Sequence, residues 1–288
     1  MLSVIIPCAS RVDLLVEQLE ALTSMECREA WEVVVVDNDL SEEGFPAAEL
    51  ERFYTELPSF RLVEAHGMRG AGYARNVGVA ASRGDKIAFL DADDVASEGW
   101  LAAMAMALDE HDVVASRWDI DRLNGPQGTA ARKNGQETGV RRYQHPVFLD
   151  HAGGCGLGVT RAAFEAVGGF DVEFLLLEDT DLTWRLQLAG FELAFEPGAV
   201  VHIRFRQTNR ASFKQAFGYG KYNVLLYKRY RPRGMPKLSV VDGLYALIKH
   251  PKHLWWLLQP GGWPRYLRSL GFTLGRVGGS MVFLIWGI

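Results

Sequence analysis

Three aspartates follow one short apolar run in the middle of the chain. The run 86–90 reads as a strand, and Asp91, Asp93 and Asp94 come directly after it. Unpaired charge at the end of a buried strand is costly, so these carboxylates need a partner. On an extended segment, side chains two residues apart point the same way, so Asp91 and Asp93 could converge on one divalent cation or one sugar hydroxyl. Such oxygen ligands suit Mg²⁺ or Mn²⁺. The alternative is a solvated acidic turn that caps the helix beginning near Trp100.

The elements that must position these aspartates alternate along the first part of the chain. Apolar runs predict strands, and helical spacing predicts helices. The strands are expected at 2–6, 32–36, 61–63, 86–90, 112–115, 191–195 and 199–203, and the helices at 11–22, 72–81, 100–108, 161–167 and 181–188. Strands separated by helices predict βαβ units and a mainly parallel sheet in an α/β fold. Ligands of such sheets bind beyond the carboxyl ends of the strands, so Asp37, after the second strand, should lie near the aspartates.

Composition and charge narrow the class of protein. The 288 residues carry a net charge of −4, but residues 1–201 hold 16 basic and 34 acidic side chains, whereas residues 202–288 hold 15 basic ones and a single acid, Asp242. This asymmetry suggests that the tail meets something anionic. Three cysteines without CxxC spacing argue against a disulfide framework or a zinc site and fit a reducing cytoplasm. We expect no signal peptide, and no uncharged apolar run reaches the ~18–20 residues that span a bilayer.

Six short motifs occur in order and share one resemblance. They are Ser-Val-Ile-Ile-Pro at 3–7, Val-Val-Val-Asp-Asn at 34–38, Ala-Arg-Asn-Val-Gly at 74–78, Phe-Leu-Asp-Ala-Asp-Asp at 89–94, Val-Gly-Gly-Phe-Asp at 167–171 and Glu-Asp-Thr-Asp-Leu at 178–182. Together they resemble a family 2 glycosyltransferase of the GT-A fold over residues 1–205. The resemblance implies a Rossmann-like α/β domain with a donor half at about 1–115 and an acceptor half at about 116–205. Residues 206–288 would be a basic, Trp-rich amphipathic helical extension.

The resemblance also implies a reaction, the inverting transfer of a sugar from a nucleotide-diphosphate donor to an acceptor hydroxyl. It favours a UDP-sugar and a bound Mn²⁺ or Mg²⁺ that neutralises the leaving phosphates. It assigns the cation to Asp93, Asp91 and His202, and a support role to Asp94. A lone histidine such as His202 is otherwise usually structural.

The donor contacts implied by the resemblance lie mostly at strand ends and helix starts. They are Pro7, Ala9, Asp37, Arg75, Asp91, Ala92 and Arg204. Asp37 matches the position that contacts the base, although a turn-forming role is the alternative. Arg75 could meet a phosphate or pair with one of the aspartates.

An inverting transfer needs a general base for the acceptor hydroxyl. The acidic pair Glu178 and Asp179 matches the family's catalytic pair, with Asp179 as the base, whereas acids at a helix start are also favoured for their position alone. The family pattern is not followed everywhere. Cys-Ala-Ser stands at 8–10 and Gly-Cys-Gly at 154–156, so donor contacts near Cys8 and acceptor contacts near Cys155 transfer less securely.

The tail and the competing functions complete the expectations. Basic, Trp-rich segments often lie at a membrane interface, so we expect peripheral contact through 206–288 at the inner face of the cell membrane. A helical subdomain folded back on the core, or a dimer interface, is the alternative. The acceptor would be a saccharide, a lipid-linked molecule or a small molecule, in cell-surface glycan or glycolipid synthesis, and nucleic acid is not expected as a partner. A non-catalytic nucleotide-sugar-binding scaffold is the second hypothesis. A sugar nucleotidyltransferase is the third, but residues 8–11 lack the repeated glycines it would need.

Overall fold

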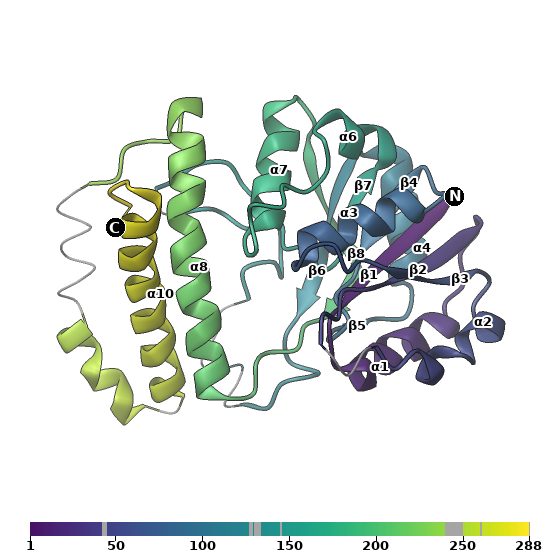
Figure 1. Cartoon of the computed structure of the whole chain (residues 1–288), viewed down its shortest axis with the longest axis horizontal. Coiled ribbons are helices and arrows are strands. Elements are labelled where there is room, and N and C mark those ends of the chain that lie inside the picture. Colours follow the sequence, from purple (N-terminus) through teal and green to yellow (C-terminus); the bar gives the residue numbers. More distant parts are fainter. Residues whose placement is uncertain are drawn as a thin grey trace. The chain divides into compact units, whose positions relative to one another are not determined.

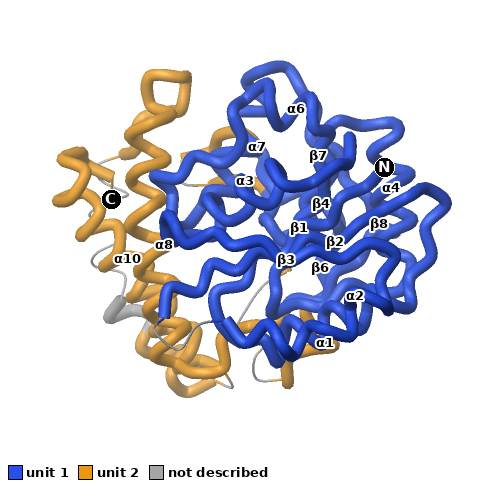
Figure 2. The backbone as a smooth tube through the Cα atoms, turned by 45° about the vertical axis from the view of Figure 1, so that its right-hand side comes forward, with its two compact units in different colours: residues 1–119, 135–141, 150–203 blue, residues 120–134, 142–149, 204–288 orange. Residues whose placement is uncertain are grey.

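The computed structural model describes residues 1–41, 45–126, 129, 134–144, 146–239, 250–259 and 261–287. Two compact units divide the chain, and Figure 2 colours them separately. The first contains residues 1–119, 135–141 and 150–203, and the second contains residues 120–134, 142–149 and 204–288. The second unit thus takes two segments from within the stretch predicted as the sugar-transfer domain. Parts of the polar segment 121–145 lie outside the described residues.

An eight-stranded sheet forms the centre of the first unit in the described residues. Its strands are β1 (Leu2–Cys8), β2 (Trp31–Asp37), β3 (Phe60–Glu64), β4 (Lys86–Phe89), β5 (Val95–Ala96), β6 (Val113–Asp119), β7 (Leu157–Thr160) and β8 (Leu193–His202). They are ordered β3-β2-β1-β4-β7-β6-β8-β5. Strands β3, β2, β1 and β4 are parallel, as are β6 and β8, whereas β7 runs antiparallel to β4 and β6 and β5 antiparallel to β8.

The sheet confirms the α/β prediction, with two differences in detail. β7 lies antiparallel to both of its neighbours, β4 and β6, so this part of the sheet is mixed. The two short strands expected near 191–195 and 199–203 form the single strand β8. A register shift at Ser116/Arg117 of β6 accommodates the break between them, which the sequence shows as Pro197-Gly198.

Helices cover the sheet and bury its apolar residues (Figure 1). They are α1 (Val12–Thr23), α2 (Phe53–Glu56), α3 (Ala71–Ala81), α4 (Trp100–Glu110), α6 (Arg161–Ala166) and α7 (Glu178–Leu188), with a 3₁₀ turn η1 (Ala47–Leu50). α3 packs on β1, β2 and β3, and α4 packs on β6 and β8. A side chain on Gly78 of α3 would place its Cβ 2.7 Å from a methyl carbon of Val36, so glycine lets this helix approach the sheet closely. This contact sets how closely α3, which carries Arg75, lies against the sheet.

The strand register brings the predicted site elements to one edge. Cys8, the last residue of β1, pairs with Asp37, the last of β2, and Ile5 pairs with Phe89 at the end of β4. The carboxyl ends of these parallel strands therefore meet, as the βαβ pattern predicts. The segments that follow them carry Asp37 and the three aspartates.

The second unit is mainly helical in its described residues. It contains α8 (Asn209–Tyr230), α10 (Gly262–Phe283) and the 3₁₀ segments η2 (Arg231–Arg233) and η3 (His250–Leu258). α8 and α10 run alongside each other (Figure 1). Glycines of α10 face the α8 backbone, because a side chain on Gly271 or Gly279 would meet a carbonyl oxygen of Phe213 or Lys221 within 3 Å. Among the helices described here, none has the length and apolar character to cross a membrane. Asp242, the one acid of the tail, lies outside the described residues.

Candidate active site

Arg75 of α3 joins two parts of the carboxyl edge of the sheet. Its Nη2 donates to Oδ1 of Asp91 at 2.6 Å, and its Nη1 donates to Oε1 of Glu178 at 2.7 Å. The side chain is 3% exposed, and its guanidinium carbon lies 5.3 Å from the centre of the Phe170 ring. A buried cation between two acids holds both in place, because either acid alone would be left with an uncompensated charge. The structure thus shows Arg75 pairing with an aspartate, one of the two options, while its contact with donor phosphate stays a prediction.

Glu178 and Asp179 form the first turn of α7, and they have different environments. Burial raises the pKa of Glu178 to about 7, the charge of Asp179 adds to the rise, and the Arg75 guanidinium opposes it. Asp179 is half-buried, and its two oxygens accept from backbone amides, Oδ2 from Gly154 at 2.9 Å and Oδ1 from Thr180 at 2.6 Å. One acid of the pair is therefore committed to an ion pair. The other is a carboxylate held by two amides, which suits a general base.

The segment 153–156 packs tightly against Arg75 and contacts both Asp91 and Asp179. A side chain on Gly154 would place its Cβ 2.9 Å from Nη2 of Arg75, so glycine lets this backbone lie against the guanidinium. Gly156 has φ +78° and donates to the carbonyl of Phe89 at 2.7 Å. The Cys155 sulfur accepts from the Asp91 amide at 3.3 Å. Although this segment departs from the commoner family pattern, it connects the end of β4 to the start of α7.

The aspartates after β4 lie in a turn. The Asp94 amide donates to the Asp91 carbonyl at 3.4 Å, so the expectation of an extended backbone here is wrong. Among the described residues, the side chains that gather are Asp91, Asp94 and Cys155, whose ligand atoms lie within 4.8 Å of one another. Asp93, half-buried in the same turn, stays a predicted cation ligand. Asp94, which was given a support role, lies beside Asp91.

The oxygens of this turn fit a hard divalent cation. Burial raises the pKa of the Cys155 thiol well above its usual range, and the charges of Asp94 and Asp91 raise it further. Sulfur is also a soft ligand, so it suits a hard divalent cation poorly. Carboxylate oxygens remain as the donor set, and these are the ligands that Mg²⁺ and Mn²⁺ prefer. Asp91 meets Arg75 through Oδ1, and its role as a cation ligand stays a prediction.

His202, the last residue of β8, is brought to the aspartate turn by the sheet. It pairs with Val95 of β5, the residue that follows Asp94. Its Nδ1 lies 2.5 Å from Oδ2 of Asp119, the last residue of β6. A carboxylate on one ring nitrogen fixes the orientation of an imidazole, as it does for many metal-binding histidines. The location agrees with a ligand role for His202, which stays a prediction.

Asp37 lies at the same edge, at the end of β2. Its Oδ2 is 2.8 Å from Nε2 of His66, and its Oδ1 accepts from the Asp39 amide at 2.8 Å. Asp37 is buried, whereas the His66 side chain is 45% exposed. The donor-base contact assigned to Asp37 stays a prediction, and His66 becomes a second polar group beside it.

The remaining predicted donor residues differ in location. Pro7 is half-buried in β1, Ala9 is exposed just after that strand, and Ala92 is half-buried in the aspartate turn. Burial raises the pKa of the Cys8 thiol to about 12, so this side chain is neutral. Arg204 belongs to the second unit, and its donor contact stays a prediction.

Sequence reasoning missed two residues of this edge. Asp119 and His66 come at or just after the ends of β6 and β3, so the strand-end rule that identified Asp37 would have identified them if applied to every strand. Cys155 was assigned to the acceptor region, but its contact with Asp91 has no signal in the sequence, because it depends on the fold of the glycine-rich segment.

Comparisons with known proteins identify the family. The family model described as "Glycosyl transferase family 2" matches residues 3–167. The chain belongs to this family. Glycosyltransferase AglE of Haloferax volcanii is 29% identical over 257 residues, which cover 88% of this chain and 83% of AglE. A pre-mycofactocin glycosyltransferase of Mycobacterium tuberculosis is 27% identical over 225 residues, which cover 76% of this chain. The chain spans less than half, 44%, of the length of that mycobacterial relative.

Solved structures confirm the GT-A fold of this family member. Mannosyltransferase PcManGT from Pyrobaculum calidifontis, in complex with GDP-Man and Mn²⁺, aligns with a TM-score of 0.61 at 17% identity, covering 98% of this chain and 78% of its own. S. aureus TarS 1-349 in complex with UDP-GlcNAc aligns with a TM-score of 0.57 at 15% identity, covering 99% of this chain and 92% of its own. At these identities the similarity is one of fold.

Proposed function

We propose that this chain is an inverting glycosyltransferase that moves a sugar from a nucleotide-diphosphate donor, preferably a UDP-sugar, to an acceptor hydroxyl. The observation that carries the proposal is the acidic pair at the start of α7, linked through Arg75 to Asp91 at the end of β4. This link joins the helix turn that carries the candidate base, Asp179, to the aspartates of the donor side within one family 2 fold. A scaffold that only binds nucleotide sugars would have no use for the base.

Asp179 acts as the general base in this proposal. The acceptor oxygen attacks the anomeric carbon from the face opposite the diphosphate, and its proton passes to the Asp179 carboxylate. The bond from the anomeric carbon to the diphosphate oxygen breaks, and the diphosphate leaves with the electron pair, so the configuration inverts. The amides of Gly154 and Thr180 hold the carboxylate in position for this step. Glu178 positions Arg75, and through it Asp91.

The donor side is assigned to the strand ends. Asp37 would contact the nucleobase of the donor. The rest of the donor would be contacted by five further residues, which are Pro7, Ala9, Arg75, Ala92 and Arg204. Asp93, Asp91 and His202 would hold Mn²⁺ or Mg²⁺, which when bound neutralises the charge that develops on the leaving diphosphate. Proteins of the same fold support this assignment, since GalNAc-T7 was solved with UDP, GalNAc and Mn²⁺ and TarS with UDP-GlcNAc.

The acceptor and location are proposed more broadly. We assign the acceptor hydroxyl to a saccharide, a lipid-linked molecule or a small molecule in cell-surface glycan or glycolipid synthesis. Residues 206–288 would hold the protein at the inner face of the cell membrane. The excess of basic residues in the tail supports this location, because the inner leaflet is anionic.

A donor screen tests the proposal. Thermal shifts with UDP, GDP and dTDP identify the base, and release of nucleotide from the matching sugar donor then measures turnover with Mn²⁺, with Mg²⁺ and after chelation. Asp93→Ala should abolish turnover, whereas Asp85→Ala, at the other end of β4 and exposed, should not. Full turnover by Asp93→Ala, or by the chelated enzyme, would contradict the cation assignment. Failure of every donor to shift or turn over would contradict the function.

A further inference from the structure

Exposed apolar side chains gather at one end of the chain. Of the twenty large apolar residues exposed among those described, ten lie in η3, in α10 and in the few residues after α10. They include Trp255 at 55%, Leu258 at 91% and Leu284 at 89% exposed. Single exposed apolar residues are ordinary, but a contiguous group marks a surface that binds a partner or a membrane.

Part of this exposed apolar group lies on one face of α10, here called the apolar line. Six apolar residues recur every three or four positions, and they are Trp263, Leu267, Leu270, Leu274, Val277 and Met281. Residues at this spacing share one face of a helix. The glycines at 271, 275 and 279 form a separate face, which packs against α8. The packing of α10 against α8 therefore leaves Trp263, Leu274 and Met281 of the apolar line exposed.

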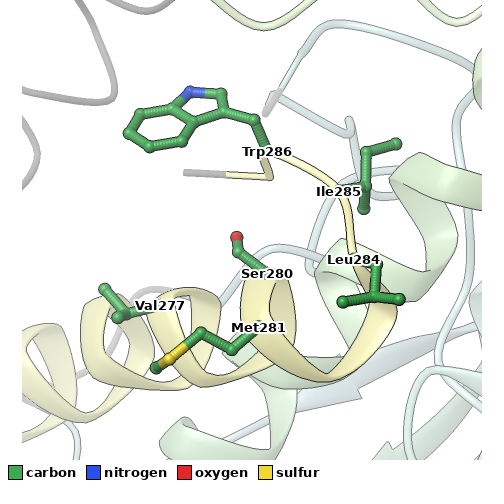
Figure 3. A pocket seen from close by; sticks show the side chains of 6 residues that line it. All are labelled: Val277, Ser280, Met281, Leu284, Ile285 and Trp286. Carbon is green, nitrogen blue, oxygen red and sulfur yellow. The ribbon is translucent and has the colours of Figure 1, made fainter.

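A hollow continues this line at the end of α10 (Figure 3). Its volume is about 430 Å³, and its lining residues are Val277, Ser280, Met281, Leu284, Ile285 and Trp286. The one hydroxyl among them, Ser280 Oγ, already accepts from the Gly287 amide at 3.1 Å. The hollow is thus an apolar depression suited to hydrocarbon.

Cations border the apolar surface. Lys228 of α8 donates through Nζ to the Phe283 carbonyl at 3.0 Å, and the Lys221 ammonium lies 6.0 Å from the Phe283 ring centre. Toward the other end of α10, the Arg265 guanidinium lies 5.3 Å from the Trp256 ring centre. Residues 202–288 as a whole contain 15 basic residues and one acid. Long basic side chains beside Trp and Leu are typical of segments that lie in a membrane interface.

We propose that η3 and the apolar line of α10, defined above, form a surface that binds an anionic phospholipid bilayer and lies in its interface. The inference deepens the membrane contact above, and it rests on the proposed function only for placing a lipid-side acceptor there. A second copy of the chain fits less well, because pairing this surface with itself would bring two strongly basic regions together. The Lys and Arg side chains would instead meet lipid phosphates, each contributing about 1 kcal/mol.

Vesicle flotation of the full chain tests the proposal. The probes are vesicles of phosphatidylcholine alone and of phosphatidylcholine with phosphatidylglycerol, at low and high salt. Met281→Glu is compared with Met106→Glu in α4, since the two methionines are similarly exposed, at 66% and 60%. We expect binding to the anionic vesicles only. High salt should weaken it, because exposed charges are screened. Met281→Glu should bind at least about tenfold more weakly, and Met106→Glu like the unmodified chain.

Several outcomes would overturn the proposal. These are equal binding by both variants, equal binding to neutral vesicles, and no binding to either vesicle. A stable dimer without vesicles that Met281→Glu dissociates would show that a second copy occupies the surface. Circular dichroism confirms that each variant is folded. Nucleotide release from a soluble donor is measured on the same samples, so loss of membrane binding with intact turnover is distinguished from failure of the proposed function.

Discussion

Replacing Arg75 by glutamine should leave two acids without the cation that joins them. Glutamine keeps the polar character of the side chain but is shorter and uncharged, so Asp91 and Glu178 lose their common partner. The Arg75 side chain is 3% exposed and that of Glu178 is 10% exposed, so water cannot replace the lost interaction at this side of the site. The Asp91 side chain is 37% exposed, so solvent screens its charge and reduces the cost of losing the Arg75–Asp91 ion pair.

The expected destabilisation depends on pH through Glu178. At about pH 8 this acid is ionised, and breaking a buried pair costs about 3–5 kcal/mol. Burial already raises the pKa of Glu178 to about 7, and Arg75 opposes that rise, so the glutamine variant should raise the pKa further. At about pH 5 the carboxyl is protonated in both proteins, so mainly the screened Asp91 pair is lost, at below about 2 kcal/mol. The variant should therefore be least stable, relative to the unmodified protein, above neutral pH.

Urea unfolding at the two pH values measures this difference, with hydrogen exchange read on peptides from β1 to β4 to follow the first unit. Arg185→Gln is the matched control, because Arg185 also pairs with a buried acid, Asp181, at 2.7 Å, but does not contact Asp91. Its variant should lose stability without losing donor turnover, whereas Arg75→Gln should lose both. Unfolding free energies for Arg75→Gln within about 0.5 kcal/mol of the unmodified protein at both pH values would refute the buried bridge.

Three further changes test neighbouring features. Gly154→Ala should lower turnover at least about tenfold, because its Cβ would press on the Arg75 guanidinium. Gly139→Ala should not, because its Cβ would have no atom within 4 Å. Equal activity of the two variants would contradict the tight packing at Gly154. Because folding raises the pKa of Glu178, the folded state holds this proton more tightly than the unfolded state. Stability from this group should therefore fall as pH rises from about 4.5 to about 7, by roughly 2–3 kcal/mol, and Glu178→Gln should lack that fall in urea titrations. In the second unit, Gly275→Ala should lower the thermal midpoint because its Cβ would meet an α8 carbonyl, and Gly278→Ala, whose nearest neighbour is a ring carbon at 3.4 Å, serves as the control.

The sequence predicts the components of the site better than their pairing. Asp37 and the aspartate turn were predicted to meet because both follow strands of one parallel sheet, and the register confirms this. The acids at the start of α7 were identifiable by motif. The bridge through Arg75 was not, because it connects side chains 103 residues apart in the chain and depends on how α3 and α7 pack.

The local errors also have physical causes. The residues after β4 form a turn and not the expected extended segment. The sequence did not show this, because an apolar strand pattern does not show where hydrogen bonding to the neighbouring strand stops. Asp91 and Asp94 thereby came together through a backbone contact within the turn. The contact of Cys155 with Asp91 could not be predicted, because a glycine-rich segment has no periodicity from which its path can be derived. Asp119 and His66, in contrast, were within reach of the strand-end rule.

The most direct test of the central claim is the turnover of Asp179→Asn. Asparagine keeps the shape of the side chain, but its single oxygen accepts from only one of the two backbone amides and it cannot accept the proton of the acceptor hydroxyl. With the donor identified by thermal shift, we expect donor affinity to stay within about twofold and the rate of sugar transfer to fall by about 10²–10⁴-fold. Transfer by Asp179→Asn at the rate of the unmodified protein, with the same donor and acceptor, would contradict Asp179 as the general base.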